Sequence, residues 1–231
     1  MTISVEIMSR RKSAVIAGSA ILAMSVLAGY AYGFVFDRLV IPGEASATVR
    51  HIKASGLLFR SGILAWTMIL VCDVLAAWAL YYFLKQVSEG LSLLMAWFRL
   101  VYAVMLGGAI LNLDAIPVLL NNTMTVTQDT EAQVMLFIQL FQRSWSAALI
   151  LFGLHLLILG FLAFRSGYIP VIWSVLLTIA GLSYLGVHTA KLLFSQYEVP
   201  IESIETVLSV PMAAGEMGLG IWLLIRGRIA L

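Results

Sequence analysis

Stretches of about 20 apolar residues recur from one end of this chain to the other, and they restrict it to a membrane-spanning helical fold. A helix of about 20 apolar residues crosses the hydrocarbon core of a bilayer. The composition agrees, because 61% of the 231 residues are hydrophobic and 11% are charged, against about a quarter charged in soluble domains. Such a chain cannot cover a soluble core with polar surface. We therefore expect an all-α membrane protein.

Six such stretches predict a bundle of six transmembrane helices in a single polytopic domain covering residues 1–231. Helix-breaking residues mark the joints, such as Pro42 and Gly43 after the first span. The fourth apolar segment is longer than a bilayer requires, so we expect its start to project from the membrane. The predicted spans are residues 13–35, 56–84, 91–120, 140–164, 168–193 and 204–225.

The connection between the first two spans has two interpretations. Residues 44–53 form either a short amphipathic helix on the membrane surface or a solvated loop. In the helical interpretation Val49 and Ile52 contact lipid, while Arg50 and Lys53 lie among the headgroups.

The Lys and Arg residues of the short connections predict the orientation, because cytoplasmic loops contain the excess of positive charge. Seven of them fall on the side of the two termini and four on the other side, so we expect both termini in the cytoplasm. On the side of the termini lie Arg10, Arg11, Lys12, Lys85, Arg165, Arg226 and Arg228, and on the other side lie Arg38, Arg50, Lys53 and Lys191.

Charge and motifs exclude several classes of protein. The formal net charge is +2 and the basic residues are scattered, which is unlike the clustered basic surface of a nucleic-acid-binding protein. The sequence has no G-x-S-x-G motif, phosphate-binding P-loop or dinucleotide glycine pattern, so an ordinary soluble cofactor enzyme is not expected. The partner that the sequence predicts is the lipid bilayer. It predicts no particular cofactor or oligomeric state.

Ionisable residues inside the spans are the most informative about function. A charge near the centre of a bilayer costs about 2.5 kcal/mol or more and is rarely kept without a partner. Four of the predicted helices each place one ionisable residue about 12–16 Å from the cytoplasmic end, at about 1.5 Å per residue. We therefore predict a shared buried polar layer of Asp73, Arg99, His155 and Glu216.

Two interpretations of this inner layer stay open. In the first, Arg99 neutralises Asp73 or Glu216 in a sealed network that stabilises the bundle. In the second, the layer lines a cavity where the acids relay protons, or where Asp73, His155 and Glu216 hold a metal ion. No local His-x-x-x-His or His-Glu-x-x-His spacing supports the metal hypothesis, so these three residues are only candidate ligands.

A second polar layer is expected in the outer third of the spans. Tyr184, His188 and Lys191 share one face of the fifth helix because their spacing is four and three residues. A stripe of Glu205, Ser209, Met212 and Glu216 on the sixth helix would connect the two layers, beside Pro211. The layer lines a vestibule or anchors the helices among the headgroups. Its predicted members are Arg60, Asn112, Arg143, Tyr184 and His188, with Asp114 and Glu205 at similar depth.

Five segments and one acid resemble a known family. They are RLVIPGEA at 38–45, LFRSG at 58–62, FRL at 98–100, GLH at 153–155 and FRSGYIP at 164–170, with Asp73. Together they resemble the bacterial membrane family catalogued as domain of unknown function 4386. The resemblance extends over nearly the whole chain and implies a multi-pass protein of the bacterial cytoplasmic (inner) membrane. It implies no particular activity or ligand.

Three functions remain open from the sequence. The first is a carrier for a small solute or protons, with the inner layer at its centre. The second is an intramembrane hydrolase, metal-assisted or not, that acts on a lipid-like substrate. The third is a non-catalytic membrane protein that binds lipid or a partner. A carrier requires access to the layer from both sides of the membrane and an enzyme requires a pocket open to one leaflet.

Overall fold

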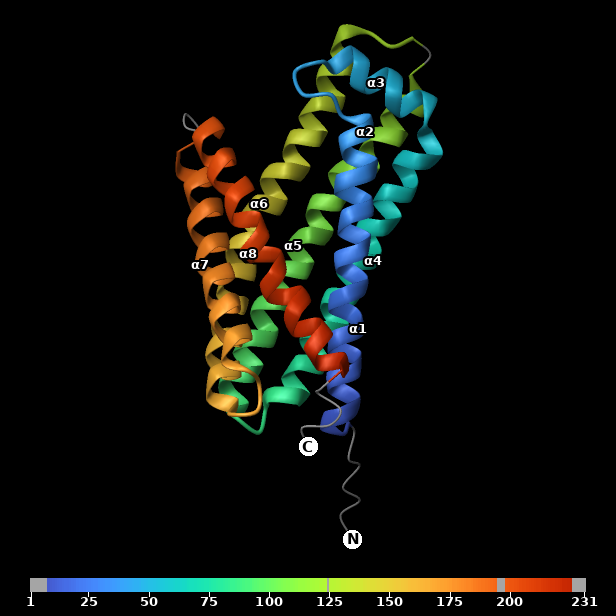
Figure 1. The fold of residues 1–231 in the computed structure, drawn as a ribbon. Helices are drawn as coiled ribbons and strands as arrows, with labels where there is room; N and C mark the ends of the chain where they lie inside the picture. Colours follow the sequence, from blue (N-terminus) through green and yellow to red (C-terminus); the bar gives the residue numbers. More distant parts are fainter. Residues whose placement is uncertain (1–7, 124, 195–197, 226–231) are drawn as a thin grey trace.

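The computed structural model describes residues 8–123, 125–194 and 198–225. Within these residues six helices are long and apolar enough to cross a membrane, which confirms the all-α class and the six-helix bundle (Figure 1). Each predicted span overlaps one of them. Their bounds are Arg10–Leu39, Gly56–Leu84, Glu89–Asn121, Gln128–Ser166, Val171–Leu193 and Ser203–Ile225.

The first span is one continuous rod of three segments, α1 (Arg10–Ala28), the π-helical η1 (Gly29–Phe36) and α2 (Asp37–Leu39). After the short α3 (Ala45–Ala54), the remaining spans are α4 (Gly56–Leu84), α5 (Glu89–Asn122), α6 (Gln128–Ser166), α7 (Val171–Leu193) and α8 (Glu198–Ile225). Local sequence sets several boundaries. Thr127 forms a capping box with Thr130 at the start of α6, and Gly167 ends that helix with a φ of 72°, a left-handed conformation that favours glycine.

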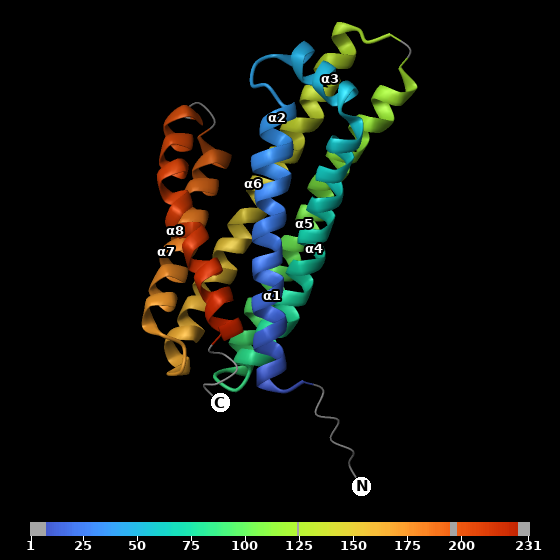
Figure 2. The same cartoon turned by 45° about the vertical axis from the view of Figure 1, so that its right-hand side comes forward.

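The six spans form a ring. Each packs against its neighbours in sequence, in the order α1, α4, α5, α6, α7 and α8, and α8 returns to contact α1 (Figures 1 and 2). The start of α1 and the end of α8 lie at one end of the bundle, together with the α4–α5 and α6–α7 turns, and we call this the terminal end. The α3 helix lies at the opposite end. The cytoplasmic location of the terminal end stays a prediction.

Glycines allow two pairs of helices to approach closely. In α6 and α7, a Cβ atom added at Gly153 would lie 2.9 Å from the carbonyl oxygen of Gly181, and the reverse distance is also 2.9 Å. In α1 and α8, a Cβ atom at Gly18 would lie 2.7 Å from the carbonyl oxygen of Gly220. The second contact closes the ring near the terminal end, and in both views the ribbons of α1 and α8 separate beyond it (Figures 1 and 2).

The connection between the first two spans is helical, but its apolar side does not face lipid. Val49 and Ile52 of α3 are buried, and α3 packs against α6. The reason is the length of α6, whose 39 residues extend about 58 Å at about 1.5 Å per residue and so project past the bilayer core. This projecting part provides a protein surface for α3. Arg50 and Lys53 are exposed.

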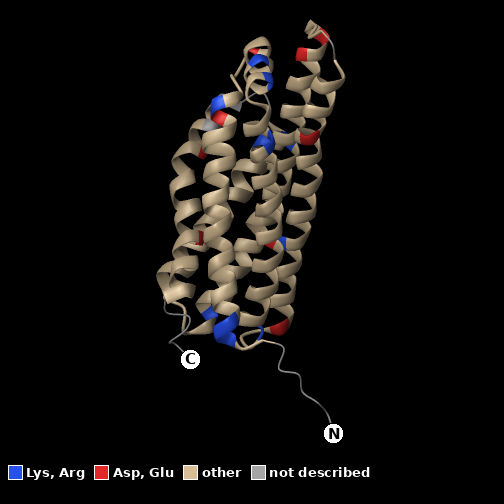
Figure 3. Ribbon diagram, turned by 90° about the vertical axis from the view of Figure 1, so that its right-hand side faces the viewer, with Lys and Arg blue, Asp and Glu red and all other residues tan. Residues whose placement is uncertain are grey.

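Charged residues lie mainly at the two ends of the bundle, with a few in its middle (Figure 3). This distribution is typical of a protein whose middle zone lies in hydrocarbon. The exceptions in the middle zone define the candidate site.

Candidate functional site

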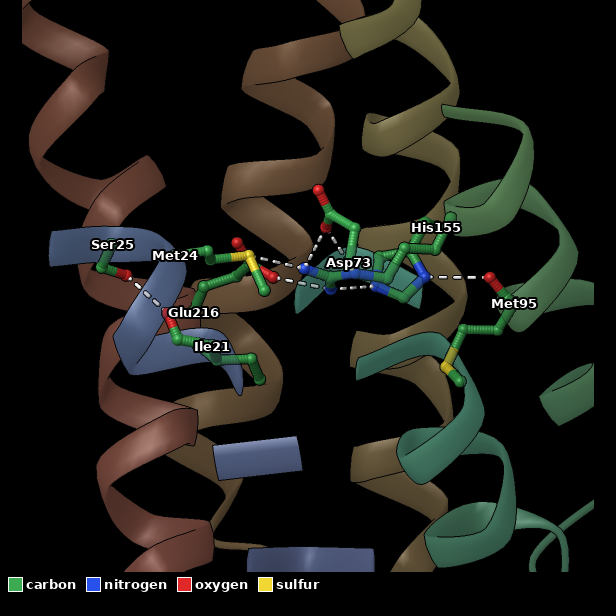
Figure 4. A network of polar contacts seen from close by, with 8 residues as sticks. Ile21, Met24, Ser25, Asp73, Met95, His155 and Glu216 are labelled. Atoms are coloured by element: carbon green, nitrogen blue, oxygen red, sulfur yellow. Dashed lines mark hydrogen bonds and ion pairs between the residues drawn. The ribbon is translucent and has the colours of Figure 1, made fainter. Parts of the chain in front are cut away.

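The structure brings the four predicted inner residues together around the guanidinium group of Arg99, which lies on α5. Arg99 Nε donates to Oδ1 of Asp73 on α4 at 2.9 Å, and Arg99 Nη2 lies 2.8 Å from the same oxygen. Arg99 Nη1 donates to Oε1 of Glu216 on α8 at 2.9 Å. The side chains of Asp73, His155 and Glu216 point toward one centre from three different helices (Figure 4).

His155 on α6 links this centre to the backbone of α5. Its Nδ1 lies 2.9 Å from the carbonyl oxygen of Met95, and its Nε2 lies 3.0 Å from Arg99 Nη1. A carbonyl oxygen only accepts and a guanidinium only donates, so Nδ1 has the hydrogen and Nε2 accepts. His155 is therefore neutral in this arrangement and adds no charge to the centre.

Two further side chains complete the surroundings of Arg99. Arg99 Nη2 donates to Sδ of Met24 on α1 at 3.2 Å. The guanidinium carbon lies 5.2 Å from the centroid of the Phe152 ring, within the range of a cation–π interaction. Every guanidinium nitrogen thus has a polar partner, and five of the six spans contribute to what we call the Arg99 cluster: Met24, Asp73, Arg99, Phe152, His155 and Glu216.

Burial differs among the members of the cluster. Arg99 and His155 are 0% exposed and Asp73 is 1% exposed, whereas the side chain of Glu216 is 15% exposed. Among the described residues, Oδ2 of Asp73 is buried without a hydrogen-bond partner. One guanidinium faces two carboxylates, so the cluster has a formal charge of −1 when both acids are ionised.

The three candidate metal ligands are Asp73, His155 and Glu216. Each of them forms a hydrogen bond with Arg99. In the part of the chain that the structure describes, there is no group of three or more His, Cys, Asp or Glu side chains that could hold a metal ion. The depth of these residues along their helices predicts a common layer, and the cation at the centre of that layer is the guanidinium group of Arg99.

The predicted outer layer is only partly assembled. Tyr184 stacks on His188 with ring centroids 5.8 Å apart, and His188 Nδ1 lies 2.9 Å from Oγ of Ser146 on α6. His188 Nε2 lies 3.9 Å from Oε1 of Glu205, which is also paired with Lys191. We call Ser146, Tyr184, His188, Lys191 and Glu205 the outer polar group.

The other predicted members of that layer lie elsewhere. Arg60, Asp114 and Arg143 are exposed on the surface of the bundle. The side chain of Asn112 donates to Gly108 and Ala109, two carbonyl oxygens of its own helix, at 3.4 and 3.2 Å. The stripe on α8 is also interrupted, because Met212 is buried but Ser209 is exposed and donates to its own helix.

Aromatic rings connect the two polar groups, a feature that the sequence interpretation missed. The Phe152 ring lies 5.3 Å from the Tyr184 ring and 5.7 Å from the His155 ring. Contacts therefore run from Arg99 through Phe152 and Tyr184 to His188. Phe152 is three residues before His155, so helical spacing places the two on one face, and that signal could have identified it. No signal in the sequence identified Met24.

Comparison with known proteins gives the family without an activity. The family model described as a domain of unknown function (DUF4386) matches residues 16–227. An Archaeoglobus fulgidus relative named "Uncharacterized protein" is 32% identical over 161 residues, which cover 70% of this chain and 80% of the relative. This relative is archaeal, so the expected bacterial origin is not confirmed. No solved structure matches. This multi-pass membrane protein belongs to the family of domain of unknown function 4386.

Proposed function

We propose that this protein is a carrier that moves a small solute together with protons across the membrane, and that the Arg99 cluster is its central site. The observation that supports this most is the excess of acid in the cluster. Arg99 bonds Asp73 and Glu216 at the same time, and these acids lie on different helices. One carboxylate is enough to neutralise the charge of Arg99, so stability alone does not require the second acid.

The second carboxylate gives the cluster a site for a proton. In a medium of low dielectric constant, a formal charge of −1 is costly, and binding one proton removes it. A proton on Glu216 would also weaken the attraction between Glu216 and Arg99, because the pair would lose one of its charges. Proton binding would thereby loosen α8 from α5.

Glu216 is suited to be the acid that gains and loses this proton. It is the most exposed of the four predicted inner residues, whereas Asp73 is almost fully buried. It lies four residues before Gly220, where α8 crosses α1, on the side where the two ribbons separate. Pro211, one to two turns earlier in α8, has no amide hydrogen to donate, which favours bending of the helix there.

The outer polar group suggests a route toward the α3 end of the bundle. Glu205 and Glu216 both lie on α8, and the buried Met212 lies between them. In parallel, Tyr184 and Phe152 connect His188 to Arg99. We propose that solute and protons pass along α6, α7 and α8 between the two groups.

Accessibility of Met212 tests this proposal without knowledge of the solute. Cys72 is the single cysteine of the chain, so Cys72→Ser gives a background without thiols. In that background we expect Met212→Cys, in protein reconstituted into liposomes, to react with a charged, membrane-impermeant thiol reagent from each side. Gly90→Cys, in the exposed first turn of α5, is the control that reacts from one side only. Protection of Met212→Cys from both sides would instead support a sealed structural network.

Transport itself is tested by currents on a solid-supported membrane. Liposomes containing the protein would receive mixtures of amino acids, carboxylic acids, sugars and nucleosides under an imposed pH gradient. We expect one mixture to give a current that depends on the gradient and that is lost in Glu216→Gln. Glu44→Gln, at an exposed residue before α3, is the matched control and should keep the current. A current that Glu216→Gln leaves intact would refute the role of the Arg99 cluster.

We further propose that the protein lies in the cytoplasmic membrane with both termini inside. The excess of Lys and Arg on the side of the termini supports this orientation.

A further inference from the structure

A groove lies between α4 and α5, away from the Arg99 cluster. Its volume is about 460 Å³, within the usual range of binding pockets for small ligands. Trp78 and Tyr81 of α4 and Leu93, Ala96 and Trp97 of α5 are among its lining residues. Val74 and Leu100, which also line it, follow Asp73 and Arg99 directly in the sequence but lie on the outer surface of the bundle.

The groove faces the hydrocarbon part of the bilayer. Trp78 is 41% and Trp97 57% exposed, and an exposed side chain in a membrane span contacts lipid. Apart from the hydroxyl group of Tyr81 and the indole N–H groups, the lining side chains are aliphatic or aromatic carbon. Such a lining fits a hydrocarbon chain and provides little for a polar solute.

One end of the groove reaches the terminal end of the bundle, where a positive charge is held beside it. Lys85 Nζ lies 4.6 Å from the centroid of the Tyr82 ring. That ring contacts two groove residues, Tyr81 at 5.3 Å and Trp78 at 5.6 Å between ring centroids. This cation–π contact with the Tyr82 ring places the ammonium group beside the groove, where it can interact with an anion.

A carboxylate also lies at this end. The Tyr81 hydroxyl donates to Oε1 of Glu89 at 3.4 Å, and Glu89 is exposed. Its negative charge opposes an anionic ligand, whereas the charge of Lys85 favours one. For a ligand that has a phosphate group, we therefore expect neutralisation of Lys85 to weaken binding and neutralisation of Glu89 to strengthen it.

We propose that this groove binds one acyl chain of a phospholipid whose phosphate group interacts with Lys85. The apolar lining provides contacts along the chain, and the Tyr82–Lys85 pair lies at headgroup depth, where aromatic and basic residues commonly meet lipid phosphates. The site is independent of the proposed transport function, since no residue of the Arg99 cluster lines it.

Native mass spectrometry of the full chain tests this proposal. The protein, purified from its membrane and exchanged into a detergent, is titrated with phosphatidylglycerol or with diacylglycerol of the same acyl chains. We expect about one tightly bound phosphatidylglycerol per chain and weaker binding of the diacylglycerol. Lys85→Gln should weaken phosphatidylglycerol binding about fivefold, the equivalent of about 1 kcal/mol for one basic residue near a lipid surface. Glu89→Gln should strengthen it.

Two variants test the groove itself. Ala96→Phe fills it, and Trp97→Ala removes one wall at a position exposed enough for folding to be unaffected. Both should reduce binding of phosphatidylglycerol. Val104→Phe on the same helix, 74% exposed and outside the groove, is the matched control for Ala96→Phe, and Arg165→Gln is the control for Lys85→Gln.

Three outcomes would overturn the proposal. The first is equal binding by the wild type and by both groove variants. The second is equal affinity for the two lipids, because it removes the role of the phosphate. The third is a dimer whose formation is lost in Trp97→Ala, because a second copy of the chain would then occupy the groove.

Discussion

Arg99 Nε on α5 and Oδ1 of Asp73 on α4 form a hydrogen bond of 2.9 Å between side chains that are 0% and 1% exposed. A buried ion pair of this kind stabilises a membrane protein chiefly because each charge would be very costly without the other. Glu216 adds a second acid to the same cation. The stability of the bundle should therefore depend very unequally on the three residues.

Arg99→Gln should be the most destabilising single change in the cluster. It leaves the buried carboxylate of Asp73 and the partly buried carboxylate of Glu216 without a cation, which should cost about 3–5 kcal/mol or prevent folding. Glu216→Gln leaves Arg99 paired with Asp73 and should cost about 1 kcal/mol or less. Thermal unfolding in detergent, followed by circular dichroism, compares the two. Arg143→Gln, at an exposed position of α6, should leave the melting temperature unchanged.

Removing the whole charge network should recover most of the stability lost in Arg99→Gln. In the triple variant Arg99→Gln, Asp73→Asn and Glu216→Gln, no charge remains to be neutralised. We therefore expect a melting temperature well above that of the single variant Arg99→Gln. A triple variant less stable than the single variant would show that hydrogen-bond geometry, and not charge, dominates the stability of the cluster.

His155 should be a neutral imidazole with its hydrogen on Nδ1. The carbonyl oxygen of Met95 and Arg99 Nη1 require this form, since the first only accepts and the second only donates. Nitrogen NMR of histidine-labelled protein, with His155→Asn to assign the signals, should show one protonated and one unprotonated ring nitrogen. Two protonated nitrogens would contradict the described hydrogen bonds.

Gly153→Ala should destabilise the contact between α6 and α7. Its Cβ atom would lie 2.9 Å from a backbone oxygen of α7, so the two helices would have to move apart. Gly186→Ala is the control on α7, because a Cβ atom there would lie within 4 Å of no atom of the described residues. The control should keep or slightly raise the melting temperature, since alanine favours helix by about 1 kcal/mol over glycine. Equal effects of the two changes would refute the close contact.

Single cysteines at the two ends of the bundle test the orientation. In the Cys72→Ser background, Gly90→Cys lies at the terminal end and Ser46→Cys at the α3 end. We expect impermeant thiol reagents added to intact cells to label Ser46→Cys, and Gly90→Cys to react only after the membrane is opened. The reverse pattern would place both termini outside.

The number and approximate limits of the spans follow from the sequence, because hydropathy along a segment is a local property that length and composition determine. The depth of Asp73, Arg99, His155 and Glu216 along their helices also follows from counting residues, since each adds about 1.5 Å. These two kinds of information suffice to predict a buried polar layer. They say nothing of how far each helix is rotated about its own axis.

Only the tertiary structure decides that rotation, because it depends on how neighbouring helices pack. Packing brings Tyr184 into contact with both Phe152 and His188 and leaves Arg60 and Arg143, at similar predicted depth, on the surface. Packing also pairs Arg99 with both Asp73 and Glu216. The sequence alone does not decide which of these acids is its partner. Depth is a property of one helix, whereas a contact requires the depth, rotation and separation of two helices to agree.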